Sequence, residues 1–150
     1  MKKPANSNMY EVTAEGVLAV YGSLVEGTGA ETVLALSAEP LPEDARGALS
    51  ASLEALGYGR DALATAACGA LGAQDLLTVV EGLDPLCLVS ADAASSALLA
   101  VAYRHDVPDD DACRLMGRPV VAFRDFPALL ATPEDKQRAW ALLKKLPKIS

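Results

Sequence analysis

The sequence predicts an α/β fold in which helices cover both faces of a parallel sheet. Short apolar segments alternate along the chain with segments of helical periodicity, a pattern typical of repeated strand–helix units. The apolar segments lack the polar alternation of half-exposed strands, so both faces of the sheet are expected to be buried. With 150 residues, 51% of them hydrophobic, the chain is long enough to form one domain, residues 1–150, with a full core.

Each element of this fold has a local signal. Pro42 and the acidic residues behind it open the helix after the first strand, and Gly57 is suited to end it. Thr132 is the expected N-cap of the last helix, which should lie against the sheet through Trp140 and Leu143. Residues 1–9 are expected to be a flexible start, and residues 105–118 a polar loop. The expected strands are residues 32–37, 62–66, 86–90 and 119–123, and the main helices are residues 13–26, 73–81, 91–104 and 133–146.

The charge balance argues against a nucleic-acid partner at physiological salt. The net charge is −7 and the sequence pI is about 4.6, whereas DNA affinity comes largely from Lys and Arg that neutralise phosphates. Arg114, Arg118 and Arg124 flank the fourth strand and are the candidates for a small anion site, with scattered surface charge as the alternative. The acidic run 109–111 is interpreted as a solvated loop rather than a metal site.

Neither a metal nor a cofactor is indicated. Cys68, Cys87 and Cys113 are widely spaced and form no Cys-x-x-Cys pair, so we expect no metal centre and no disulfide framework. Cys87 is expected in the core, while Cys68 and Cys113 are candidates for free thiols. His105 is the single histidine and is interpreted as a surface residue after a helix. No apolar run could span a membrane and no secretory leader is apparent, so a cytoplasmic protein is expected.

The last quarter of the chain resembles the uracil-DNA glycosylase superfamily. In that family a buried strand leads to a His-Pro-Ser signature, then Ala-Leu-Leu and a closing helix. With the Ala-Leu-Leu of residues 128–130 in register, Asp125 stands in place of the family's His. Phe126 and Pro127 then replace the Pro and the Ser. The resemblance, which covers about residues 32–145, implies a three-layer α/β/α sandwich with a four-stranded parallel sheet in the order 2-1-3-4.

The two other motifs of the family are also altered. The first reads Gly-Glu-x-Pro-Gly; here Pro40 aligns with the proline and Glu39 stands one position late. Ser37 and Leu41 replace the glycines, whose missing Cβ lets backbone approach a nucleotide. The second motif is Thr-Asn, whose Asn reads the flipped base, and here it is Thr65 followed by Ala. The cluster cysteines of the iron–sulfur class are absent as well.

These losses predict a noncatalytic domain of glycosylase type that serves as an interaction or structural module with an unidentified partner, a protein being the expected kind. The alternative is a diverged DNA glycosylase, or a hydrolase of a small nucleoside-like molecule, with Asp125 or Glu39 as the base. A pocket filled by Leu41 and Phe126 would favour the first hypothesis. In either case a ligand should bind at the carboxyl ends of the strands. The candidate residues there are Ser37, Glu39, Thr65, Ser90 and Asp125.

Overall fold

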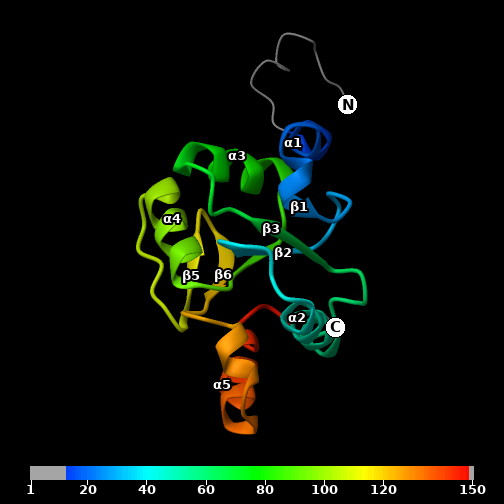
Figure 1. Ribbon diagram of the computed structural model, residues 1–150, viewed down its shortest axis with the longest axis vertical. Coiled ribbons are helices and arrows are strands. Elements are labelled where there is room, and N and C mark those ends of the chain that lie inside the picture. Colours follow the sequence, from blue (N-terminus) through cyan, green and yellow to red (C-terminus); the bar gives the residue numbers. More distant parts are fainter. Residues whose placement is uncertain (1–12, 149–150) are drawn as a thin grey trace.

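The computed structural model describes residues 13–148, and in this part of the chain five α-helices surround a six-stranded sheet (Figure 1). The expected flexible start at residues 1–9 lies outside the described residues. Two 3₁₀ helices, η2 and η3, connect the main elements. The elements follow one another as α1 (Ala14–Tyr21), η2 (Gly22–Leu24), β1 (Val25–Glu26), β2 (Val33–Ser37), α2 (Glu43–Ala55), β3 (Leu63–Ala67), α3 (Ala73–Leu83), β4 (Cys87–Ser90), α4 (Ala93–Tyr103), β5 (Asp111–Leu115), β6 (Arg118–Ala122), η3 (Pro127–Leu130) and α5 (Pro133–Leu143).

The sheet contains the four expected strands and two more. The strand order is β1-β3-β2-β4-β6-β5, and the four central strands pair in parallel. Their order matches the expected 2-1-3-4. The expectation of a purely parallel, four-stranded sheet was wrong, because β1 and β5 add an antiparallel strand at each edge.

The strand β5 arises from a hairpin within the segment that was expected to be a polar loop. Met116 and Gly117 have φ angles of 52° and 84°, so both occupy the left-handed region. Two such residues form the tight turn whose twist suits a two-residue hairpin. Only Leu115 of β5 is fully buried, and this weak apolar pattern hides the strand in the sequence.

The strand β1 arises because the first helix is shorter than expected. The helix ends at Tyr21, and the chain continues through η2 into an extended segment instead of remaining helical to Glu26. Gly22 at this point weakens helix propagation. As a result Glu26 pairs with Thr65 of β3, at the carboxyl end of the parallel sheet.

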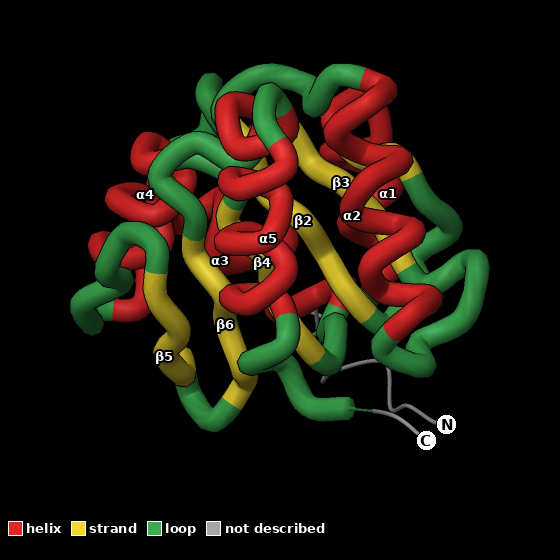
Figure 2. Tube along the Cα trace, turned by 90° about the horizontal axis from the view of Figure 1, so that it is seen from below, coloured by secondary structure: helices red, strands yellow, loops and turns green. Residues whose placement is uncertain are grey.

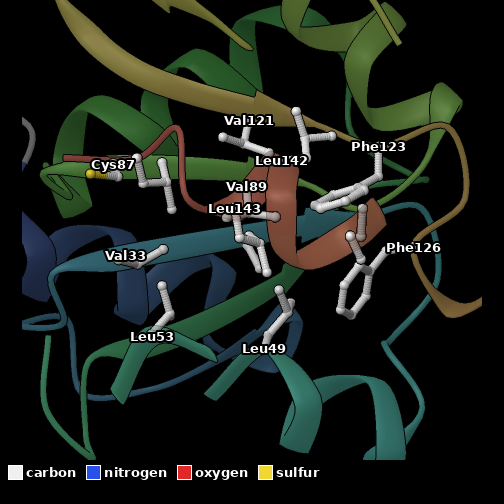
Figure 3. Close-up of a cluster of buried hydrophobic side chains, with 14 of the residues drawn as sticks. Val33, Leu49, Leu53, Cys87, Val89, Val121, Phe123, Phe126, Leu142 and Leu143 are labelled. Atoms are coloured by element: carbon white, nitrogen blue, oxygen red, sulfur yellow. The ribbon is translucent and has the colours of Figure 1, made fainter. Parts of the chain in front are cut away.

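Helices pack against both faces of the sheet, α2 and α5 on one and α1, α3 and α4 on the other (Figure 2). The first core lies between the sheet and α2 and α5, and its side chains interlock around Val89 and Phe123 (Figure 3). The second core is rich in Leu and Val from α3 and the central strands. Cys87 is fully buried in the first core, as expected.

The closing helix α5 packs against the sheet through the two residues expected. Leu143 is 1% exposed and belongs to the first core, and Trp140 is partly buried and packs against that core. Trp140 is therefore less enclosed than a full core residue, and it is not exposed. Among residues 13–148, no helix combines the length and the apolar character needed to cross a bilayer.

Candidate functional site

A pocket of about 200 Å³ lies at the carboxyl ends of β2 and β3. Four segments line it: η2 with β1, the loop after β2, the end of β3 and the loop after β3. A second, more open hollow of about 520 Å³ adjoins it on the side of α2 and shares Glu26 and Thr65 with it. The pocket thus occupies the part of the sheet where α/β proteins bind small ligands.

Three of the five expected site residues meet at this pocket. Ser37, Glu39 and Thr65 all line it. The parallel register pairs Ser37 with Ala67 and Ala35 with Thr65, so the two hydroxyl residues lie on neighbouring strands near the same end. These three expected residues therefore line one pocket, near the ends of the first two parallel strands.

The polar groups of the pocket differ in their hydrogen bonding. The Ser37 hydroxyl donates to the carbonyl oxygen of Glu39 at 2.6 Å, so its lone pairs remain for a ligand. Thr65 is 7% exposed and lines the pocket, and its hydroxyl has no hydrogen-bond partner among the described residues. Every fully enclosed side-chain oxygen and nitrogen among the described residues has a hydrogen-bond partner. Because the Thr65 hydroxyl has none, it is not fully enclosed, and it opens into the pocket that Thr65 lines.

Ser90 does not belong to this pocket. It is 0% exposed, and its hydroxyl lies 2.8 Å from the Ser96 hydroxyl and donates to the carbonyl oxygen of Asp92 at 3.1 Å. The next residue begins the turn into α4, so Ser90 serves to hold that turn. Its expected role at the pocket rim is wrong.

Asp125 does not line the pocket either, although a β-bridge joins its backbone to Asp92. Its side chain is exposed and accepts the backbone N–H of Ala128 at 3.3 Å, which caps the start of η3. The following residue, Phe126, is 1% exposed and its ring centre lies 4.9 Å from that of Phe123. The segment in the place of the family's signature is therefore part of the core, and its carboxylate faces solvent.

The pocket is not filled by the two residues that would have closed it. Leu41 lines one wall and packs partly against the first core. Phe126 lies within that core and not in the pocket. The cavity is open, so the expected sign of a closed, vacated site is not present.

An aspartate that sequence reasoning did not single out organises the edge of the site. Asp92 accepts the backbone N–H of Ala38 with one carboxylate oxygen and the N–H of Ser95 with the other, both at 2.8 Å. It thereby joins the loop after β2 to the start of α4. An Asp directly before an Ala-rich helix is a common N-cap, and this signal could have identified it.

Gly69 holds the two loops beside the pocket together. Its N–H donates to the carbonyl oxygen of Ala38 at 2.9 Å. A Cβ at Gly69 would stand 2.6 Å from that same oxygen, which is closer than real contacts allow. Next to it, Cys68 is 1% exposed, and burial raises the pKa of its thiol. Cys68 is therefore an enclosed thiol and not a reactive surface group.

Glu26 supplies a second carboxylate to the pocket, and the sequence had placed it at the end of a helix. Its side chain forms an ion pair with Arg46 of α2. Ser23 and Leu24 from η2 complete that wall. These residues were missed because Gly22 weakens the helix but does not by itself show that the chain returns to the sheet.

The three arginines proposed as an anion site are not together. Arg118 binds Glu81 and Asp84, both at 2.8 Å, at the amino end of β6. Arg124 follows the carboxyl end of the same strand, so the two lie at opposite ends of the sheet. Arg114 donates to the carbonyl oxygen of Gly117 in the hairpin turn. The three arginines therefore form no common basic patch for phosphates.

The acidic run has structural partners. Asp110 accepts the backbone N–H of Arg124 at 3.1 Å, and Asp111 pairs with Lys145 of α5 at 3.2 Å. These contacts attach the start of β5 to β6 and to α5. Within residues 13–148, no group of three or more His, Cys, Asp or Glu side chains is placed to hold a metal ion.

Comparison with known proteins adds no relationship: no protein-family model matches the chain, and no curated protein is similar to it. The site must be interpreted from its own chemistry. It offers hydroxyls and carboxylates around a small cavity, and the one histidine is remote from it. His105 follows the carboxyl end of α4, whereas the pocket lies near the amino end of that helix.

Proposed function

We propose that the chain is a noncatalytic domain of glycosylase type that acts in the cytoplasm as a binding or structural module. The observation that carries the proposal is the placement of Asp125 and Phe126. A glycosylase needs a group that stabilises negative charge on the departing base. Here Asp125 stands at the matching position, and its side chain is exposed and does not line the pocket, so the group that would stabilise that charge is missing.

The second support is the altered chemistry of the pocket. Base flipping requires a side chain that hydrogen-bonds the edge of the extruded base. Ala66 stands where the family has that Asn, and Leu41 stands where a glycine lets the nucleotide approach. The pocket keeps its place on the sheet without the groups that make it a glycosylase site.

A uracil-release assay tests this proposal. Single- and double-stranded DNA that carries uracil should stay intact with the purified chain and also with its Asp125→Ala variant. Uracil release that Asp125→Ala or Thr65→Val abolishes would overturn the proposal. A contaminating glycosylase would be recognised because its activity would be equal in all variants.

The alternative is a hydrolase of a small nucleoside-like molecule, and one observation favours it. Glu39 is a carboxylate at the mouth of an open pocket, next to the hydroxyls of Ser37 and Thr65. A carboxylate so placed can polarise a water molecule. Release of free base from a panel of nucleosides, lost in Glu39→Gln and kept in Asp125→Ala, would establish this activity. No release from any of them would exclude it for that panel.

The proposed module is not expected to bind DNA at physiological salt. The net charge is −7, and Arg118 is already neutralised by two carboxylates. Fluorescence anisotropy with a labelled oligonucleotide should show no saturation at about 150 mM salt. Micromolar affinity there, with a steep salt dependence lost in Arg124→Gln, would contradict this prediction.

A further inference from the structure

The pocket at the ends of β2 and β3 presents several hydrogen-bond acceptors, namely the carboxylates of Glu26 and Glu39 and the hydroxyl oxygens of Ser37 and Thr65. The Ser37 hydroxyl has given its proton to the Glu39 carbonyl at 2.6 Å, so only its lone pairs face outward. The N–H groups of Ala38 and Gly69, which would otherwise be donors, are bonded within the fold to Asp92 and to the Ala38 carbonyl. The ligand that fits such a pocket must therefore bring the donors.

The Thr65 hydroxyl is open to such a ligand. The residue is 7% exposed, and no described residue bonds to its hydroxyl. Among the described residues no fully enclosed side-chain oxygen lacks a partner, so this hydroxyl faces the pocket. A hydrogen bond to a ligand in such a sheltered place is stronger than one in open water. Because Thr65 lines both this pocket and the adjoining hollow, a molecule seated there can satisfy it.

The charge of the pocket is negative. Glu26 and Glu39 both line it, and Arg46 neutralises only Glu26. Among the described residues, Glu39 has no ion-pair partner. The carboxylates do not gather as a metal site, since no metal-binding group of acidic side chains is found between residues 13 and 148. An organic cation can instead use the one carboxylate that has no ion-pair partner among the described residues together with the nearby hydroxyls of the pocket.

We infer that this pocket binds a small organic cation, an amine whose ammonium group is held by Glu39 and by the Thr65 hydroxyl. The volume of about 200 Å³ limits its size. Cavities of about 150 Å³ hold benzene, and pockets for drug-sized ligands begin near about 300 Å³. The ligand is therefore a little larger than a six-membered ring.

Three probes of equal chain length test the inference by calorimetric titration: 1,4-diaminobutane, 1,4-butanediol and succinate. The diamine should bind saturably, one molecule per chain, and the diol and the diacid should bind at least about tenfold more weakly. Binding should weaken as salt rises, because Glu39 is exposed to screening. Equal binding of the diol, tighter binding of succinate, or no saturation with the diamine at millimolar concentration would overturn the inference.

Variants locate the site. Glu39→Gln should weaken diamine binding about tenfold or more, because a charge-assisted bond becomes a neutral one. Thr65→Val keeps the shape and removes the hydroxyl, and it should also weaken binding. Glu134→Gln, an exposed carboxylate at the start of α5, is the matched control and should leave binding within about twofold. If all three variants bind alike, the diamine binds the acidic surface in general and the inference fails.

Amide chemical shifts give a second measurement that does not depend on affinity. Diamine binding should shift the signals of residues 37–41 and 65–70, and signals near Asp84 at the opposite end of the sheet should stay unchanged. The inference goes beyond the proposed noncatalytic role, and the two can fail separately. Uracil release would contradict that role alone, and absence of diamine binding would contradict this inference alone.

Discussion

Introducing the glycosylase signature should bring this protein close to unfolding and should give it no glycosylase activity. Three changes, Asp125→His, Phe126→Pro and Pro127→Ser, would write the family's sequence into the chain. The first and third positions are exposed or partly exposed and should tolerate the change. Phe126 is 1% exposed and packs on Phe123 in the first core, so the second change removes a core side chain.

The size of the effect has two parts. Deleting a buried aromatic side chain costs about 3–5 kcal/mol, which is the expectation for Phe126→Ala. Proline also removes the Phe126 N–H, which donates to the carbonyl oxygen of Ala91 at 2.8 Å. Ala91 is 0% exposed, so its carbonyl would lose a partner in a dry place, at about 1–3 kcal/mol more. The φ angle of −61° already suits proline, so backbone strain adds little.

Urea denaturation followed by circular dichroism measures these parts separately. Phe126→Ala should lower the free energy of unfolding by about 3–5 kcal/mol, and Phe126→Pro should lower it further. For a domain with about 5–15 kcal/mol of total stability, the proline variant should be close to unfolding. The double variant Asp125→His, Pro127→Ser is the control, and it should fold and release no uracil.

Two results would refute this reasoning. If Phe126→Pro lowers the stability by less than about 1 kcal/mol, Phe126 is not a core residue and the loop after β6 is placed wrongly. If the triple variant folds and releases uracil, the scaffold still holds a working site that only the signature had lost. If Phe126→Ala and Phe126→Pro are equally stable, Phe126 is still a core residue, but the bond from its N–H to the Ala91 carbonyl does not contribute to stability.

Three further predictions concern stability and titration. Leu143→Ala should lower the free energy of unfolding, measured by urea denaturation, by about 2–5 kcal/mol. Trp140→Ala should lower it by less than is usual for a core aromatic, which is about 3–5 kcal/mol, because the Trp140 ring is only partly buried. A larger loss at Trp140 would contradict the placement of α5. The pKa of Glu31 is lowered, because hydrogen bonds from Thr28 and Gly29 outweigh its partial burial. Its stabilisation is therefore present above the ordinary pKa of 4.5 and lost as the pH falls through the lowered value, so the stability gap between the native chain and Glu31→Gln should close on acidification; a constant gap would refute this. Partial burial raises the pKa of Glu81, but hydrogen bonds from Tyr103 and Arg118 outweigh this and leave the pKa lowered. Arg118→Gln should therefore raise the Glu81 pKa in an NMR titration. An unchanged Glu81 pKa would show that Arg118 does not stabilise the charged carboxyl.

The parallel half of the fold could be predicted because its signals are local. The strands β2 and β4 are fully buried and apolar, and Thr132 caps α5 just as its sequence indicates, with its hydroxyl accepting the N–H of Asp135. Burial on both faces leaves no doubt about a strand's place at the centre of a sheet. The order of the four parallel strands followed from the resemblance.

The edge strands could not be predicted because neither has a distinct apolar pattern in the sequence. β1 has two residues, and it exists because η2 turns the chain toward β3. β5 is largely open to solvent on its side chains, and its position depends on the hairpin at Met116 and Gly117. For the same reason the sequence did not predict that Glu26 lines the pocket, because Glu26 belongs to β1.

Some of the expected site residues line the pocket and others do not. Ser37, Glu39 and Thr65 come from the carboxyl-terminal parts of two neighbouring strands, and such parts converge in a parallel sheet, so these three line one pocket. Ser90 and Asp125 also follow strand ends, but their loops turn away into α4 and η3. The direction of a loop depends on capping bonds and on core residues such as Phe126, which a motif comparison does not weigh.

The aspartate that joins the β2 loop to α4 tolerates few substitutions. Asp92 accepts one backbone N–H with each oxygen. An asparagine has one acceptor oxygen, and its amide nitrogen would oppose one of the two donors, while a glutamate is a methylene too long. Either change would therefore break at least one of the two bonds. The edge of the pocket is thus held by a residue whose identity is fixed by the two backbone donors it meets and not by any ligand.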